Sequence, residues 1–154
     1  MFRFLSVLIP LGLLAGTAAA QEREWTLDAS DEDAYLVFGV PETDDIGVSL
    51  WCPIRKGTVN LFLPRPTETL QTAAQGKLPM TISAGAEKAT FAARADINIA
   101  SSMSSLEVEM PADHPLLKAL ESADRFSITL PGEDIVFPFY GADFPSLMEL
   151  CRKD

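Results

Sequence analysis

The sequence predicts an α+β fold with one or more largely antiparallel sheets of about 7–8 short strands and three short helices. Short segments repeatedly alternate apolar and polar side chains, which is typical of half-buried strands, and most are joined by short turns, as in hairpins. Three other segments carry apolar residues three or four positions apart, as helices do. We expect the helices on one face or at one end of the sheet. A β-sandwich with added helices is the alternative.

The N-terminal residues have the pattern of a secretion signal. Arg3 precedes the apolar run LSVLIPLGLLAG, which is shorter than the ~20 residues of a membrane span. Small residues at Ala18 and Ala20 form a cleavage motif. We expect residues 1–20 to be a signal peptide cleaved after Ala20. The remaining protein would be periplasmic or secreted, without a membrane anchor. An uncleaved anchor or a buried helix is the alternative.

The remaining chain is expected to be acidic and to form a single domain. Residues 21–33 predict an exposed acidic leader, with Trp25 and Leu27 touching the body, and residues 34–154 predict one α+β domain. Without residues 1–20 the chain has 22 acidic and 11 basic residues, a net charge of −11. Such a surface repels nucleic acid and anionic lipid and favours a cationic partner. The same charge also promotes solubility.

Residues 34–64 predict a three-stranded meander. The mostly apolar segment 34–40 leads into the turn PETDDIG, and segments 48–54 and 58–64 both alternate. This alternation places Cys52 on the inner face with its apolar neighbours.

The middle of the chain predicts a short helix followed by further strands. Residues 64–76 form a helical pattern with Thr67 as the N-cap. Residues 78–96 predict a hairpin. Residues 97–104 fit either a strand or a loop, whereas 105–110 alternate strictly and predict a strand.

The last third of the chain contains an internal echo. ADHPLLKALESAD (112–124) and ADFPSLMELCRKD (142–154) align without gaps and share six of thirteen positions. In each copy an aspartate, Asp113 or Asp143, is expected to cap a helix with a proline in its first turn. Residues 124–140 predict a hairpin between the two helices. The echo is either a duplicated strand–helix unit or two independent uses of one capping pattern.

The two cysteines predict a disulfide. In an exported protein, Cys52 and Cys151 are expected to pair. Closing a loop of about 100 residues stabilises a protein by ~4–5 kcal/mol in the chain-entropy model. The spacing excludes a C-x-x-C redox motif. These cysteines and the single histidine, His114, are too few for a structural zinc site.

The sequence offers no motif for a catalytic residue, a metal or a cofactor, and we predict none of them. No nucleophile elbow, P-loop, dinucleotide fingerprint or haem-attachment motif occurs, and the acid-rich segments do not match a calcium loop. His114 stands where the echo has Phe144, which favours packing and capping over catalysis. Glu107 and Glu109 share one side of a strand and are the pair that a hydrolase would use. A solvated sheet face is the alternative.

Three aromatic residues define a candidate partner-binding patch. Trp51 and Phe62 alternate with inward-facing neighbours, and Tyr140 alternates with Phe139. If they share the outer face of the sheet, they form an apolar patch for a partner. The alternative is that helices cover this face and bury them.

The ending FPFYGADFPSLMELC resembles the C-terminal pattern of small exported proteobacterial proteins of the invasion-associated locus B type. In those proteins a last strand, a Gly-Ala step and a short helix with a late cysteine close the domain. The resemblance covers these residues, the signal peptide and the domain size, whereas the cysteines are placed differently. It implies a periplasmic α+β domain of non-enzymatic function and transfers no functional residues.

Together these observations predict a soluble periplasmic, non-enzymatic binding or accessory protein of the cell envelope. An inhibitor, a chaperone-like module and an assembly factor all fit this description. The expected partner is another envelope protein, with a basic surface as the electrostatically favoured kind. An envelope hydrolase that uses carboxylates is the alternative, and a scaffold subunit of a larger assembly is a third hypothesis.

Overall fold

The computed structural model describes residues 22–70, 76–100 and 102–153, and these contain nine strands and three helices. The strands are β1 (Glu24–Ala29), β2 (Asp33–Gly39), β3 (Ile46–Pro53), β4 (Thr58–Pro66), β5 (Lys77–Ala84), β6 (Glu87–Asp96), β7 (Met103–Pro111), β8 (Arg125–Leu130) and β9 (Glu133–Pro138). The helices are α1 (Thr67–Leu70), α2 (Pro115–Leu120) and α3 (Phe144–Cys151).

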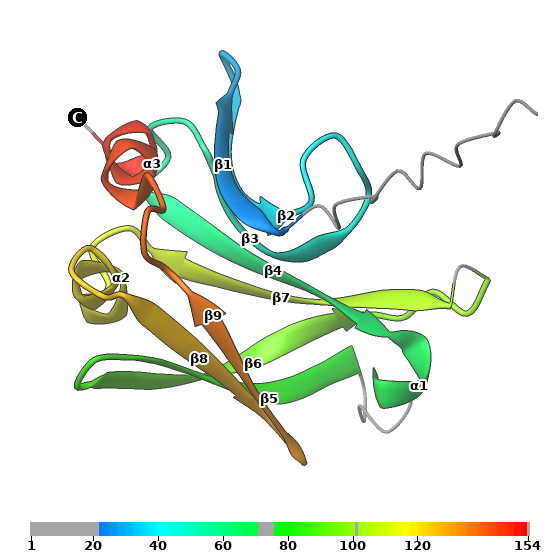
Figure 1. Cartoon of the computed structure of the whole chain (residues 1–154). Coiled ribbons are helices and arrows are strands. Elements are labelled where there is room, and N and C mark those ends of the chain that lie inside the picture. The colour runs from blue at the N-terminus through cyan, green and yellow to red at the C-terminus, as the bar shows by residue number, and fades with distance from the viewer. Residues whose placement is uncertain (1–21, 71–75, 101, 154) are drawn as a thin grey trace, which may run out of the picture.

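All nine strands form one curled antiparallel sheet in the order β1-β2-β3-β4-β7-β6-β5-β8-β9 (Figure 1). The α+β prediction with a largely antiparallel sheet is confirmed. The sandwich alternative is wrong for the described residues, because their strands make one continuous sheet. The predicted count of 7–8 strands is too low. The additional strand is β1, which pairs with β2 in the segment 21–33 that was expected to be an exposed leader.

The alternation of the central strands determines which side chains enter the core. Leu36, Leu50, Leu61 and Val108 are register neighbours across β2, β3, β4 and β7, and all four are buried. Because side chains alternate between the two faces of a strand, their neighbours along the chain form a second row on the outer face. The predicted meander and its inner face are therefore confirmed.

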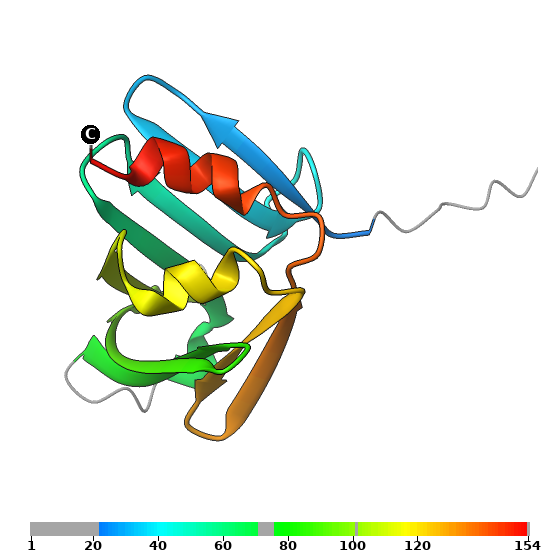
Figure 2. The same ribbon diagram turned by 90° about the vertical axis from the view of Figure 1, so that its left-hand side faces the viewer.

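Helices α2 and α3 both lie on the inner face of the sheet. Figure 2 shows them side by side on one side of the strands. Their buried residues, among them Leu117 and Leu147, belong to the same core as the inward-facing side chains of the strands. Within the described parts of the chain, no helix has the length and apolar character that crossing a membrane requires.

The two helices of the echo begin differently. The N-cap of α2 is His114, whose ring Nδ1 accepts a hydrogen bond from the Leu116 backbone N–H at 3.2 Å. The predicted cap, Asp113, is wrong by one residue, because the residue before Pro115 is held outside the helical region. Asp143 is the N-cap residue of α3, as predicted, but its side chain makes no capping hydrogen bond.

The predicted role of Thr67 as an N-cap is also wrong. Thr67 is the first residue of α1, and its buried hydroxyl bonds the carbonyl oxygen of Asn98 and the hydroxyl of Ser104, each at 2.9 Å. These bonds tie the start of α1 to the β6–β7 connection at Asn98 and to the start of β7 at Ser104. Residues 71–75 of the predicted helix lie outside the described residues.

An aromatic cluster joins the two edge strands of the curled sheet. The indole N–H of Trp25 on β1 donates to the carbonyl oxygen of Pro138 on β9 at 2.7 Å. The rings that surround this bond make a continuous series of contacts, and we call them the aromatic cluster: Trp25, Phe38, Phe126, Phe137, Phe139 and Phe144. Trp25 touches the body as predicted, and it does so from within the sheet.

The predicted disulfide between Cys52 and Cys151 is present. The two sulfurs are 2.00 Å apart and the Cα atoms 5.6 Å apart. The bond joins the inner face of β3 to the last residue of α3, and both cysteines are fully buried. Two backbone hydrogen bonds reinforce this junction: Arg55 donates to the Leu150 carbonyl at 2.8 Å and Gly57 to the Cys151 carbonyl at 2.9 Å.

Candidate functional site

The outer face of β2, β3, β4, β7 and β6 carries the side chains that the core does not use. One register row runs through Tyr35, Trp51, Asn60 and Glu109, and the next runs through Phe62, Glu107 and Arg94. We call these seven residues the outer patch. Helices α2 and α3 pack on the opposite face, so the patch is left partly open to solvent.

A stacked pair of aromatic rings lies at one end of the outer patch. Tyr35 and Trp51 face each other on adjacent strands, with ring centroids 5.8 Å apart and planes tilted by 18°. Tyr35 is 39% exposed, and Trp51 is partly exposed. Cross-strand aromatic pairs of this kind stabilise a sheet by roughly 0.5–1.5 kcal/mol beyond their burial. The stacking therefore holds both rings in fixed positions at the surface.

A carboxylate lies beside this ring pair. The pKa of Tyr35 is raised above its ordinary value, first by partial desolvation of the phenol and then by the negative charge of Asp33 and a hydrogen bond to its side chain. Asp33 is two residues before Tyr35 on β2, so both side chains point to the same face. The ring pair therefore has a fixed negative charge at its edge.

We expect Asp33→Asn to lower the pKa of Tyr35 toward its ordinary value. The substitution removes the negative charge that disfavours the phenolate, so Tyr35 ionises at lower pH. The titration is followed by the ultraviolet absorbance of phenolate in a Tyr140→Phe background, which leaves Tyr35 as the single tyrosine. Asp31→Asn, at an exposed neighbouring acid, is the control and should leave the pKa in place. An equal response to both substitutions would show that Asp33 does not lie beside the phenol.

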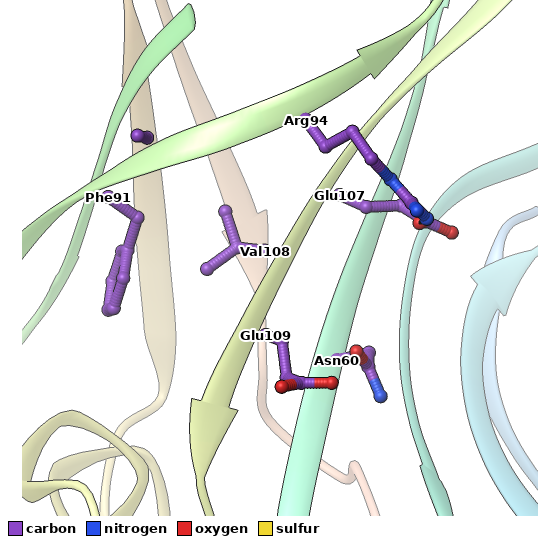
Figure 3. Close-up of a pocket in the computed structure, with 7 residues that line it drawn as sticks. Asn60, Phe91, Arg94, Glu107, Val108 and Glu109 are labelled. Atoms are coloured by element: carbon purple, nitrogen blue, oxygen red, sulfur yellow. Dashed lines mark hydrogen bonds and ion pairs between the residues drawn. The ribbon is translucent and has the colours of Figure 1, made fainter. Parts of the chain in front are cut away.

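A recess of about 410 Å³ lies at the other end of the outer patch (Figure 3). Asn60, Arg94, Glu107 and Glu109 contribute its polar lining. The guanidinium of Arg94 forms an ion pair with the carboxylate of Glu107, its register partner on β7. Glu109, opposite Asn60, is exposed. Glu109 is thus the carboxylate of the recess that remains available to a ligand.

The recess therefore contains one paired carboxylate, Glu107, and one exposed carboxylate, Glu109. Glycoside hydrolysis needs a protonated acid and a second carboxylate that acts as nucleophile or base. Here the carboxylate of Glu107 is held by Arg94, and Glu109 lies in an exposed position. Across the described residues, no three His, Cys, Asp or Glu side chains gather closely enough to hold a metal ion.

The sheet order places two of the three aromatic residues of the predicted patch on neighbouring strands and the third after a distant strand. Trp51 and Phe62 lie on neighbouring strands of the outer face and are partly exposed. Tyr140 follows β9 and is 85% exposed, and β7, β6, β5 and β8 separate β9 from β4 in the sheet order. His114 caps α2, and the centroid of its ring lies 5.5 Å from that of Phe91. Both contacts agree with the packing and capping role that its alignment with Phe144 favours.

Sequence reasoning missed Tyr35. It lies in the apolar run AYLVFGV, which reads as a strand buried on both faces. The available signal was the hydroxyl of tyrosine together with Asp33 two positions earlier, a polar pair on one face of that run. Comparisons with protein-family models, curated proteins and solved structures find no match to this chain.

Proposed function

We propose that this protein is an exported, non-enzymatic binding or accessory protein of the cell envelope and that it engages its partner through the outer patch. The observation that carries this proposal is the stacked pair of Tyr35 and Trp51, which remains partly exposed on a sheet face that α2 and α3 leave open. Aromatic residues are enriched at protein interfaces, where a rigid ring contributes large contact area at little entropic cost.

The rest of the molecule supports binding at this face. In the described residues, the inner face of the sheet is packed with α2, α3 and the aromatic cluster, so its side chains are largely buried. The N-terminal sequence has a secretory pattern, and a buried disulfide is typical of proteins in oxidising compartments. Without residues 1–20, the net charge of −11 favours a partner with a basic surface.

We expect a photo-cross-linking residue at position 62 to capture a discrete partner in the producing cells. Phe62 is partly exposed at the centre of the outer patch, so a benzophenone side chain there would touch a docked protein. The matched control replaces Glu149, an exposed residue of α3 on the opposite side of the sheet. The exported fraction is examined for adducts by mass spectrometry, which also reads whether the mature chain begins at Gln21.

A specific adduct from position 62, with none from position 149, is the expected result. Equal adducts from the two positions, or none from either, would contradict binding through the outer patch. Recovery of the chain with residues 1–20 intact in the cytoplasm would contradict its export.

A further inference from the structure

We propose, on the basis of the function proposed above, that the outer patch recognises an extended cationic polypeptide segment. One arginine or lysine side chain of that segment lies on the Tyr35–Trp51 ring pair beside Asp33. A second reaches the recess at Glu109.

The ring pair has the features of a site for a cationic side chain. A guanidinium or ammonium group over an aromatic face is attracted by the ring quadrupole, and Trp is the best ring for this contact. Trp51 is already held in place by its stacking on Tyr35. The carboxylate of Asp33 at the edge of Tyr35 adds a full opposite charge. Arginine fits such a site well because its planar group both stacks and donates to a carboxylate.

The recess provides the second negative charge. Arg94 is the basic residue among the seven of the outer patch, and its charge is balanced by Glu107. Glu109 remains exposed, whereas Asn60, its register partner on β4, is buried at the floor of the recess. The patch together with Asp33 is therefore net negative, with charge at both ends of an aromatic surface. A neutral glycan would also stack on Trp51, and its hydroxyls would donate hydrogen bonds to the carboxylates, but it would gain no charge–charge attraction from the net negative patch.

The register determines the spacing of the two sites. Tyr35, Trp51, Asn60 and Glu109 lie in one row on four adjacent strands. Strands lie about 4.8 Å apart, so the row spans roughly 14 Å from β2 to β7. An extended peptide rises about 3.3 Å per residue, and residues i and i+4 point to the same side. Two basic residues four positions apart therefore match the two sites.

The probe that tests this spacing is a labelled peptide containing Arg-Gly-Ser-Gly-Arg. A peptide of the same composition with adjacent arginines is its control. Binding to the oxidised protein is measured by fluorescence anisotropy at low and at physiological ionic strength. We expect saturable binding of the spaced peptide, weakened by salt, and weaker binding of the adjacent-arginine peptide.

Surface variants identify the contacts. Trp51→Leu should weaken binding of the spaced peptide about fivefold, the scale of a cation–π contact at an exposed site. Glu109→Gln should weaken it severalfold. Glu149→Gln removes the same charge from α3 and should change the affinity for the spaced peptide less than about twofold. An exposed charge on the opposite side of the sheet is largely screened at physiological ionic strength. Because Glu109 is exposed, its substitution tests the inference even if Trp51→Leu perturbs folding.

Four results would overturn the inference. Equal losses in Glu109→Gln and Glu149→Gln would mean that net charge alone attracts the peptide. Unchanged binding in a folded Trp51→Leu protein would remove the ring contact. Trp51-dependent binding of a neutral N-acetylglucosamine oligosaccharide in place of the peptide would assign the patch to a glycan. A specific cross-link from position 62 without peptide binding would leave the proposed function standing and refute the cationic ligand alone.

Discussion

Replacing both Cys52 and Cys151 with alanine is expected to lower the free energy of unfolding by about 4–5 kcal/mol. The disulfide joins residues that are 99 positions apart in the sequence, so it constrains a large part of the unfolded chain. In the chain-entropy model most of its contribution comes from that constraint. The measurement is urea denaturation of the double variant and the parent, followed by circular dichroism, since the midpoint and slope together give the free energy.

The native fold should survive this change at low temperature. The carbonyls of Leu150 and Cys151 accept backbone hydrogen bonds from Arg55 and Gly57, which hold the end of α3 at the turn between β3 and β4 without the disulfide. Hydrogen exchange at the Gly57 amide reads this contact directly. A loss of less than about 1 kcal/mol, or a detached α3 in the double variant, would contradict an effect exerted mainly through the unfolded state.

The inner face of the sheet could be predicted from the sequence because its signal is local. Alternation within β3 and β4 identifies the inward side chains, and hydrophobic burial then determines the side of the sheet on which α2 and α3 must pack. The disulfide could be predicted for a different reason. A chain with two cysteines permits a single intramolecular pairing once export is assumed.

Strand β1 could not be predicted in the same way because it is an edge strand with an acidic sequence. Most of its side chains are exposed, and only Trp25 and Leu27 are partly buried. Its strand conformation depends on pairing with β2 and on the bond from Trp25 to Pro138, which joins residues 113 positions apart. Such a contact leaves no periodic signal in the segment itself.

The composition of the outer patch also depends on the pairing of strands that are far apart in the sequence. Trp51 and Phe62 could be placed on an outer face by alternation, but their neighbours could not. Asn60 meets Glu109 because β4 pairs with β7, although α1 and the β5–β6 hairpin lie between these two strands in the sequence. Tyr140 was grouped with them on alternation alone, and the sheet order separates its strand from theirs.

Phe126→Ala is expected to lower the free energy of unfolding by about 3–5 kcal/mol, the usual cost of removing a buried phenylalanine ring. Phe126 is 1% exposed, and its ring contacts Phe137 and Phe139 with centroids 5.3 Å away in each case. Its contact with Trp25 links β8 to β1. Urea denaturation followed by tryptophan fluorescence measures the loss, and Phe126→Leu should recover part of it because leucine refills much of the volume.

The control for this substitution is Val136→Ala on the same hairpin. Val136 is 60% exposed, so its truncation should cost about 0.5 kcal/mol or less. If Phe126→Ala costs no more than this control, the aromatic cluster does not hold the edges of the sheet together. If it has the expected cost, the substitution should also reduce hydrogen-exchange protection more in β1 than in β4, because the cluster connects β1 to β8 and β9. The acidic N-terminal segment is then held in the folded domain by its pairing with β2 and by Trp25 with the rings around it.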